Sequence, residues 1–406
     1  MPNVVFVAPY LLEATLRFVE AAARLPGVRV ALVGSEPDGA VPAGLAAGLV
    51  TYVRVDDCLD TGQLAAGISE ASHRMGSVDR ALSILEDLQV PLAEVRERLG
   101  ISGMDAGEAA NFRDKSRMKD VLRAAGVPCA RHGLATNAEE AWAVAAQCGF
   151  PVVVKPPAGS GARGTFRAES AEQFGQWLAV SPPTSDDPAL IEEFMVGDEF
   201  SFDSVLIAGE MVWHSINHYM PSPLTVLEHP WIQWCVVLPR DIGGPEFDPI
   251  RRAGVDALRV LGMHTGLSHM EWFRRADGSV AVSEVGARPP GAQFSTLMSF
   301  AHDVDMYEAW ARLMVFDTFD PPERKWAVGA AYLRPQGRGR IRAVHGIDHL
   351  DPALHDLVVM ARLPEAGQPT SSSYEGDGYV IVRHRETAVV EQALERLITT
   401  LRIELE

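Results

Sequence analysis

The sequence predicts an α/β domain at its N-terminal end, followed by regions in which helices alternate with hairpins. Short apolar runs suited to buried strands alternate with helical segments over the first hundred residues, which is typical of a parallel sheet covered by helices. Near residue 100 the pattern changes to capped helices, a glycine-rich loop and an Asp-Gly turn between two strand-like runs. The chain has 406 residues, enough for about two to three domains.

The N-terminal strands are predicted at residues 3–8, 28–34 and 50–55, and a helix with an apolar stripe follows the first strand as far as Leu25. No glycine-rich sequence follows that strand. A dinucleotide-binding fold needs one there to hold the pyrophosphate, so this region is not predicted to bind NAD.

Capping residues mark the helices that follow. Asn111 or Asp114 can begin a helix that Gly126 ends, because these are the residue types that start and stop helices. The spacing of a capping box predicts a helix from Thr136 with Glu139 and another from Ser170 with Gln173. The remaining apolar runs predict strands at 190–193 and 199–207, a helix at 249–261 and a hairpin at 267–287.

Composition argues against several classes of protein. The chain has 54 acidic and 36 basic side chains, a net charge of −18, and a surface this acidic repels nucleic acid and anionic membranes. The cysteines at 58, 129, 148 and 235 contain no C-x-x-C pair, so neither a zinc site nor a disulfide framework is predicted. We also predict no signal peptide, no membrane span and a cytoplasmic location.

Two glutamates are predicted to face each other across the hairpin. Asp277-Gly278 favours a two-residue type I′ turn, which needs positive φ at both positions. With that turn as the loop, Glu271 and Glu284 are directly opposite on antiparallel strands. Facing like charges repel, and Mg²⁺ offsets the repulsion while also taking phosphate oxygens. Arg288 follows Glu284 by four residues, on the same face if the strand continues. The alternative is a pair of solvated glutamates.

A glycine-rich loop follows the strand that ends at Lys155. Glycines at 159, 161 and 164 let backbone N–H groups approach phosphate oxygens, aided by Ser160 and Arg163. The same glycines satisfy the dinucleotide pattern G-x-G-x-x-G, but that pattern requires a helix opening at the loop, and residues 165–168 look extended. The remaining alternative is an ordinary surface hairpin loop.

Taken in order, these features resemble the ATP-grasp superfamily, and within it the carboxylate–amine ligase branch. The resemblance covers residues from about 105 to 315. It rests on Asp114-Lys115 with Gly126-Val127-Pro128, PVVVKPPAGSGARG at 151–164, IEEFMVGDEFSFD at 191–203, and Glu271 with Glu284-x-x-x-Arg288-x-x-Gly291.

The resemblance implies a domain organisation in which two α+β subdomains enclose ATP. The parts are a Rossmann-like α/β domain at 1–105, a central ATP-grasp subdomain with the metal site at 106–130 and 195–320, a lid subdomain at 131–194 and a small α+β region at 321–406.

The resemblance also implies roles for particular residues. Arg288 and Lys155 would be catalytic, with Arg288 and Gly291 beside the substrate carboxylate and its acyl phosphate. Glu271 and Glu284 would hold Mg²⁺, with Mn²⁺ as an alternative. The ATP contacts would come from Lys115, Lys155, Ser160 and Gly161 at the phosphates, from Glu192 and the backbone of Glu193, Phe194 and Met195 at the adenine, and from Glu199 at the ribose.

One position departs from the family pattern. Gly286 stands where many members have an Asn that also binds metal, so full coordination of a second Mg²⁺ is in question. By the hairpin register Gly286 faces His269, which is interpreted as a packed or supporting histidine rather than a ligand.

The implied reaction is a two-step ligation of a small carboxylate and a small amine. The carboxylate takes the γ-phosphoryl group of ATP, giving an acyl phosphate and ADP, and the amine then displaces phosphate. An apolar amino acid and a dipeptide-like product are favoured, and a homodimer is kept open. The Trp-, His- and Pro-rich region 213–240 is the candidate substrate wall, with Glu228 and His229 near the amine, or else aromatic core packing.

Three rival functions remain. An ATP-grasp enzyme that activates bicarbonate or formate would share the ATP site, a non-catalytic module would bind ATP without releasing ADP, and an oxidoreductase would bind NAD through residues 159–164.

Overall fold

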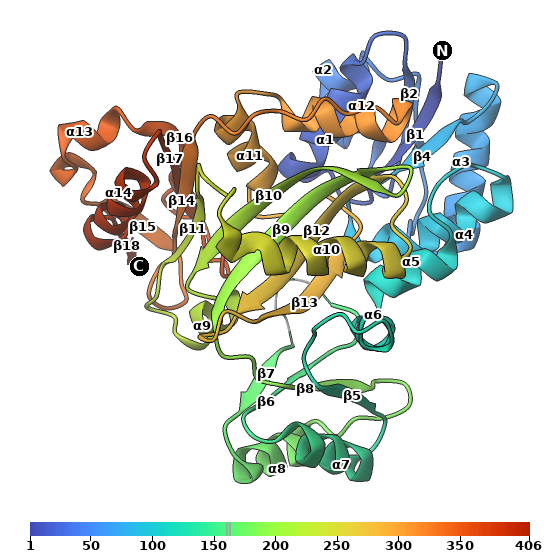
Figure 1. Ribbon diagram of the computed structural model, residues 1–406. Coiled ribbons are helices and arrows are strands. Elements are labelled where there is room, and N and C mark those ends of the chain that lie inside the picture. The colour runs from blue at the N-terminus through green and yellow to red at the C-terminus, as the bar shows by residue number, and fades with distance from the viewer. Residues whose placement is uncertain (160, 162–163) are drawn as a thin grey trace.

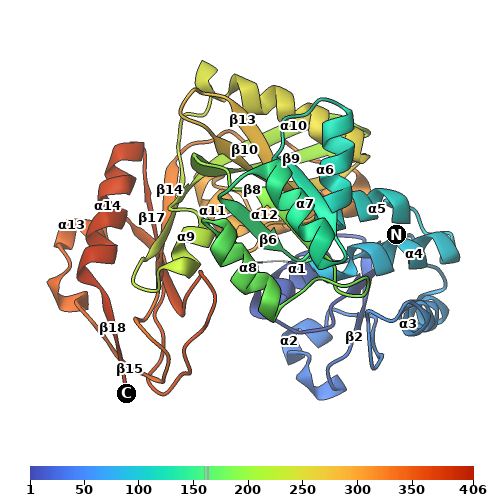
Figure 2. The same ribbon diagram turned by 90° about the horizontal axis from the view of Figure 1, so that it is seen from below.

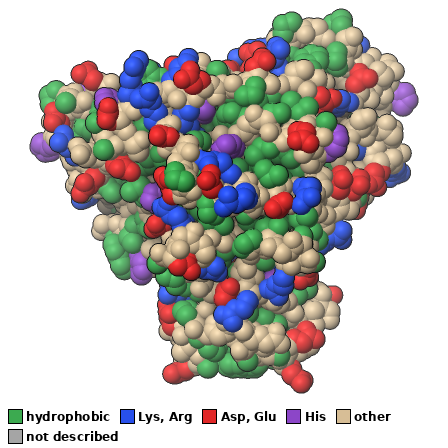
Figure 3. All heavy atoms as spheres, in the orientation of Figure 1, with side chains coloured by type: hydrophobic (Ala, Val, Ile, Leu, Met, Phe, Trp, Pro, Cys, Tyr) green, Lys and Arg blue, Asp and Glu red, His purple; other side chains and the backbone are tan. Residues whose placement is uncertain are grey.

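The computed structural model describes residues 1–159, 161 and 164–406. A large sheet occupies the middle of the molecule, with the N-terminal unit on one side, the C-terminal helices on the other and a smaller unit below them (Figure 1). In the view from below, this smaller unit lies in the middle of the picture, with the N-terminal unit on one side and the C-terminal helices on the other (Figure 2). Acidic and basic side chains are interspersed on the face shown in Figure 3.

The N-terminal unit contains the predicted parallel sheet, in the order β3-β2-β1-β4. Every residue of β1 is buried, because helices cover both faces of the sheet. Helix α1 packs on one face and helices α3 and α4 on the other. The bounds are β1 Asn3–Val7, α1 Glu13–Arg24, β2 Arg29–Gly34, α2 Ala43–Ala46, β3 Thr51–Arg54, α3 Thr61–Met75, β4 Arg80–Leu82 and α4 Gln89–Leu99.

Helices α5 (Ala106–Arg113) and α6 (Lys115–Ala124) stand where one continuous helix was predicted. Asp105 begins α5 with a capping box. Asp114 ends α5 and begins α6, where its carboxylate accepts hydrogen bonds from the N–H groups of Ser116 and Arg117. Asn111 is therefore not a cap: it lies inside α5 and donates to the Leu261 carbonyl.

The smaller unit, here called the lid, is a sheet in the order β5-β8-β6-β7, with α7 and α8 on its outer side (Figure 1). Helix α7 begins at Asn137 rather than at the predicted Thr136, whereas α8 begins at Ser170 as predicted. The bounds are β5 His132–Ala135, α7 Ala138–Cys148, β6 Val152–Lys155, β7 Phe166–Ala168, α8 Ala171–Val180 and β8 Ala189–Glu193.

The large sheet has the strand order β13-β12-β9-β10-β11-β14-β17-β16. Phe202 and Leu206 of β9 pack with α10, while Val205 packs with α11 and α12 on the opposite face. The bounds are β9 Asp198–Ile207, β10 Glu210–Met220, α9 Pro223–Glu228, β11 Trp234–Leu238, α10 Asp248–Leu261, β12 Gly266–Arg274, β13 Val280–Gly286, α11 Phe294–His302 and α12 Met306–Phe316.

The C-terminal strands β14, β16 and β17 extend this sheet, whereas β15 and β18 pair with each other in a separate two-stranded sheet. Strand β14 pairs with β11 on one side and with β17 on the other, so residues 318–325 connect parts of a continuous sheet. The bounds are β14 Ala327–Leu333, β15 Ile341–His345, α13 Pro352–His355, β16 Val358–Arg362, β17 Gly378–His384, α14 Thr387–Thr400 and β18 Arg402–Leu405. Among the described residues, no helix has the length and apolar content needed to cross a membrane.

Candidate active site

A cavity of about 1080 Å³ lies where the lid, the large sheet and the N-terminal unit meet. Its walls include the ends of β6 and β8, strands β12 and β13, the loop after β13 and the C-terminal segment 371–375. Its volume is at the upper end of the usual range for small-molecule sites, which leaves room for more than one small ligand.

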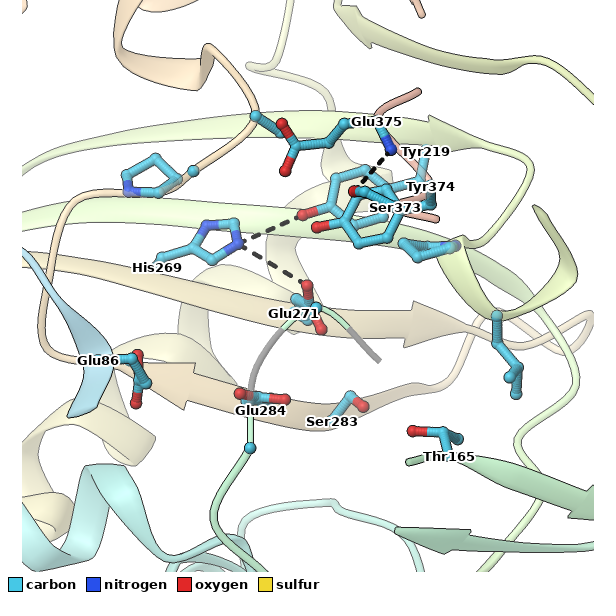
Figure 4. Close-up of a pocket in the computed structure, with 18 of the residues that line it drawn as sticks. Glu86, Thr165, Tyr219, His269, Glu271, Ser283, Glu284, Ser373, Tyr374 and Glu375 are labelled. Atoms are coloured by element: carbon cyan, nitrogen blue, oxygen red, sulfur yellow. Dashed lines mark hydrogen bonds and ion pairs between the residues drawn. The ribbon is translucent and has the colours of Figure 1, made fainter. Parts of the chain in front are cut away.

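The predicted carboxylate pair is confirmed. Glu271 on β12 is directly opposite Glu284 on β13, and both side chains line the cavity (Figure 4). Because this close-up looks onto the two strands, the facing arrangement can be followed directly. His269 is opposite Gly286, as predicted.

The pairing is right, but the prediction of a two-residue turn at Asp277-Gly278 is wrong. Arg275 and Ser279 are hydrogen-bonded and Gly278, with φ +81°, donates to the Arg275 carbonyl, so the loop has three residues, as in a turn followed by a left-handed glycine. Alone, this would shift the register by one residue. A β-bulge at Ser283 shifts it back, because Trp272 pairs with Val282 and Glu271 with Glu284.

Lysine side chains surround the pair. Lys115 Nζ is 2.9 Å from Glu284 Oε1 and donates to the Gly159 carbonyl of the glycine-rich loop at 2.7 Å. Lys155 Nζ, at the end of lid strand β6, is 2.8 Å from Glu192 Oε1. The lysines therefore join the lid, helix α6 and strand β13 at one place.

Lys119 is a functional candidate that the sequence reasoning missed. Its side chain is fully buried. Its Nζ lies 3.5 Å from Glu192 Oε2 and donates to the Ser283 carbonyl, at the bulge, at 2.5 Å. The available signal was its position four residues after Lys115, which places both on the same face of α6.

The pKa values of two carboxyl groups in the cavity are shifted in opposite directions. Burial opposes ionisation of Glu284, but Lys115, Lys155 and Arg288 outweigh it and hold the pKa of Glu284 at about 2. Burial, with the nearby Glu271, raises the pKa of Glu199 well above its ordinary value. The cavity therefore holds an ionised carboxylate at Glu284, while the environment of Glu199 disfavours the charged form of that side chain.

Arg288 reaches the cavity from the loop after β13, and not from the strand. The strand ends at Gly286, so the same-face argument from spacing does not apply. The Arg288 guanidinium instead forms a short ion pair with Glu86 and donates to the Pro289 carbonyl at 2.9 Å. Glu86 precedes α4 and was also missed, because its partner is 202 residues away.

His269 is held in a polar network. Its Nδ1 lies 2.6 Å from Asp203 Oδ1, and its Nε2 is 3.8 Å from Glu271 and 3.4 Å from the Tyr219 hydroxyl (Figure 4). Burial works against the charged ring, but Asp203 and Glu271 raise the pKa of His269 to about 9. A positive charge therefore stands beside Glu271 at neutral pH, facing the position of Gly286.

The predicted adenine-binding segment leaves one backbone donor free. The N–H groups of Glu193 and Phe194 donate to the carbonyls of Arg131 and Pro151, so they are not available to a ligand. Within the described residues, the Met195 N–H has no such acceptor. Glu192 is paired with the lysines and Glu199 is buried, but both still line the cavity.

Two substrate predictions need correction. Glu228 and His229 do not line the cavity, whereas Leu224, Thr225 and Leu227 of the same helix do. Glu228 is exposed and points to Arg167 of the lid, 3.8 Å away, and His229 stacks near Trp231. Gly161 and Gly291 line the cavity as predicted, and Ser160 and Arg163 lie outside the described residues.

The glycine-rich loop connects antiparallel strands. Strand β7 follows the loop and pairs with β6, so the helix that a dinucleotide fingerprint requires does not open there. This geometry contradicts the reading of residues 159–164 as an NAD site.

Comparison with known proteins agrees with this geometry. Residues 114–199 match the family model "Carbamoyl-phosphate synthase L chain, ATP binding domain". The chain is similar over its full length to the crystal structure of an L-amino acid ligase from Bacillus licheniformis, with a TM-score of 0.80, 17% identity and coverage of 100% of this chain and 99% of that one. The match to the family model and the shared fold agree with the resemblance to ATP-grasp enzymes. The prediction of an ATP-grasp ligase is in keeping with these similarities.

The sequence relatives include a ligase and an uncharacterized protein. An L-arginine-specific L-amino acid ligase from Bacillus subtilis is 24% identical over 64% of this chain and 63% of its own length, so the match spans less than two thirds of that relative. An uncharacterized protein, y4rH, of Sinorhizobium fredii is 26% identical over 94% of this chain and 79% of its own length.

The acidic residues that line the cavity fit a divalent cation. Glu271 and Glu284 present hard carboxylate oxygens from facing strands, and Glu284 is ionised at neutral pH. Among the described residues, no cluster of three or more His, Cys, Asp or Glu side chains has the arrangement of a metal site. A site of two carboxylates suits Mg²⁺, which takes its remaining ligands from water and phosphate.

Proposed function

We propose that the protein is a carboxylate–amine ligase that activates an amino acid with ATP and joins it to an amine, with release of ADP and phosphate. One observation carries this proposal: a partly buried guanidinium, that of Arg288, lines the same cavity as the facing glutamates and the lysines. Guanidinium groups bind carboxylates in a planar, bidentate manner, and phosphoryl transfer needs positive charge around the transferred group.

The nucleotide would lie between the lid and the large sheet. Met195 N–H would donate to the adenine edge, Glu199 would meet the ribose, and Lys115, Lys155 and the backbone at Gly161 would meet the phosphates. Glu271 and Glu284 would hold Mg²⁺, or Mn²⁺ in its place. When bound, that ion supplies positive charge to the phosphate oxygens as negative charge develops.

The chain's own residues then act in two steps. With the substrate carboxylate on Arg288, its oxygen attacks the γ-phosphorus, the bond to the β-phosphate oxygen breaks, and ADP leaves while Lys155 and Lys115 neutralise charge. The amine nitrogen next attacks the acyl carbon, the bond to the phosphate oxygen breaks, and phosphate leaves as the amine loses a proton. Contact between lid and sheet excludes water, which would otherwise hydrolyse the acyl phosphate.

Cavity size favours an amino acid over the smaller acids. The lining of the cavity also includes the side chains of Phe18, Ile84, Phe294 and Tyr307. Bicarbonate or formate would leave this apolar wall without a contact, whereas an amino-acid side chain would cover it. The aromatic lining is also in keeping with an apolar substrate.

The test is ADP release from ATP and Mg²⁺, screened against the twenty amino acids singly and in pairs, and against bicarbonate and formate, with product masses recorded. We expect release only with amino acids, and a product mass equal to the two substrates minus water. Release with bicarbonate or formate would identify the rival reaction, and binding of ATP without release would identify a non-catalytic module.

Variants connect the activity to the site. Glu284→Gln and Arg288→Ala should each abolish carboxylate-dependent ADP release while the melting temperature is retained to within a few degrees. Arg312→Ala, at an exposed position on α12, is the matched control and should retain full activity. Normal turnover in both site variants would rule out the assignment.

A further inference from the structure

The segment Ser371–Glu375 comes from the C-terminal part of the chain, yet it lines the cavity next to the carboxylate pair. It lies between β16 and β17, at the far end of the large sheet. Its conformation is held internally, because Asp377 accepts a hydrogen bond from the Ser371 N–H at 2.8 Å and the Ser373 hydroxyl accepts one from the Glu375 N–H at 3.1 Å. The segment thus presents Tyr374 and Glu375 to the cavity (Figure 4).

Tyr374 places this segment against the lid. Its ring packs edge-on against Trp234, with centroids 4.7 Å apart. It also lies 3.9 Å from the position that a Cβ at Gly161 would occupy. Since Gly161 belongs to the glycine-rich loop, the segment lies where the loop, the large sheet and the substrate end of the cavity meet.

Glu375 differs from the paired acidic side chains that line the cavity. Glu86 is paired with Arg288, Glu192 with Lys155 and Glu284 with Lys115. Burial raises the pKa of the Glu375 carboxyl, and no positive charge among the described residues counteracts it. A carboxylate removed from water without a counter-charge is unfavourable, and a cationic ligand would relieve that penalty.

We propose that Glu375 binds the positively charged nitrogen of the amino acid whose carboxylate lies on Arg288. The inference rests on the proposed ligase function and adds the chemistry of the substrate: an acid that also carries a cationic nitrogen. The cationic nitrogen belongs either to the α-ammonium group or to a basic side chain of the amino acid, and both present the same N⁺–H donors. Glu86 is a poorer receptor, because Arg288 already neutralises it.

The test compares wild type with Glu375→Gln, which keeps the shape and removes the charge. Glu365→Gln is the matched control, because Glu365 is exposed in the same connection between β16 and β17. KM is measured by ADP release for L-arginine, L-citrulline, L-leucine and 4-methylpentanoate, which is leucine without its amino group. Losing one charge-assisted hydrogen bond should raise the KM of the recognised substrate about 10- to 100-fold, with the KM for ATP unchanged.

The panel identifies which nitrogen is bound. If the KM rises for arginine alone, Glu375 binds the basic side chain. If it rises for arginine, citrulline and leucine but not for 4-methylpentanoate, Glu375 binds the α-ammonium group. Amino-acid KM values within twofold of wild type, or an equal rise in Glu365→Gln, would overturn the inference.

Calorimetry separates this inference from the proposed function. Each amino acid is titrated into wild type and Glu375→Gln with a non-hydrolysable ATP analogue present. Binding to wild type that is weakened in Glu375→Gln supports the Glu375 assignment even where no ADP is released, and in that case only the ligase function fails. Absence of amino-acid binding to wild type overturns both.

Discussion

Substitution of Glu86 by glutamine tests whether the Glu86–Arg288 ion pair positions the carboxylate substrate. The Arg288 side chain is 17% exposed and that of Glu86 8% exposed, so water screens the pair only weakly. Burial lowers the pKa of Arg288, but Glu86 outweighs burial and raises it. In the Glu86→Gln variant the amide oxygen would still accept a hydrogen bond, without the charge that fixes the guanidinium.

The magnitude follows from the strength of one charge-assisted hydrogen bond, about 1.5–3 kcal/mol. At about 1.36 kcal/mol for each factor of ten, the loss corresponds to a fall of about 10- to 150-fold in kcat/KM for the carboxylate. The KM for ATP should stay within about twofold, because Arg288 is proposed to contact the substrate carboxylate and the lysines to contact ATP.

The assay is ADP release at varied carboxylate and at varied ATP, with the melting temperature recorded for each variant. Asp87→Asn is the matched control, since Asp87 is the next residue and pairs with Arg113. An unchanged kcat/KM for the carboxylate in Glu86→Gln, with a fold as stable as that of wild type, would refute the positioning role.

Three further predictions concern buried charges and thiols. Glu284 has a pKa of about 2 in the folded protein, below its unfolded value near 4.3. Its contribution to the free energy of unfolding is therefore present above about pH 4.5 and is lost as the pH falls toward 2. When stability is measured by circular dichroism across that pH range, the Glu284→Gln variant should show a shallower loss than wild type. Lys119→Met should lower the melting temperature more than Lys325→Met does. Lys119 is fully buried and contacts both Glu192 and the Ser283 carbonyl, whereas Lys325 is half-exposed. Equal melting temperatures of the two variants would contradict this prediction. Burial raises the pKa of Cys235 to about 12, so iodoacetamide at pH 8 should leave Cys235 unmodified in the folded protein and alkylate it in urea, as followed by peptide mass spectrometry.

Local chemistry accounts for what could be predicted from the sequence. The apolar runs predicted the parallel sheet because strands buried on both faces are continuously apolar, and the caps at Asp114 and Ser170 were readable because capping is a local hydrogen bond. The facing glutamates were found because hairpin pairing is also local. The repulsion between these facing like charges then led to the hypothesis of a magnesium site.

Partners distant in sequence account for what could not be predicted. Glu86 has no local feature that marks it, since its role comes from Arg288 on another unit of the molecule. The segment 371–375 reaches the cavity only because β14 and β17 extend the large sheet past β11, which periodicity within each strand does not reveal. Glu228 and His229 were misplaced because a six-residue helix, α9, turns its apolar side to the cavity.

The bulge at Ser283 explains why a wrong turn still gave the right pair. An extra residue in one strand leaves its backbone groups unpaired, and here the Ser283 carbonyl accepts a hydrogen bond from the buried Lys119 ammonium. The same ammonium lies beside Glu192, which pairs with Lys155. Lys119 therefore connects the bulge that sets Glu284 opposite Glu271 to the lid lysine, so the register of the hairpin and the position of Lys155 depend on the same buried charge.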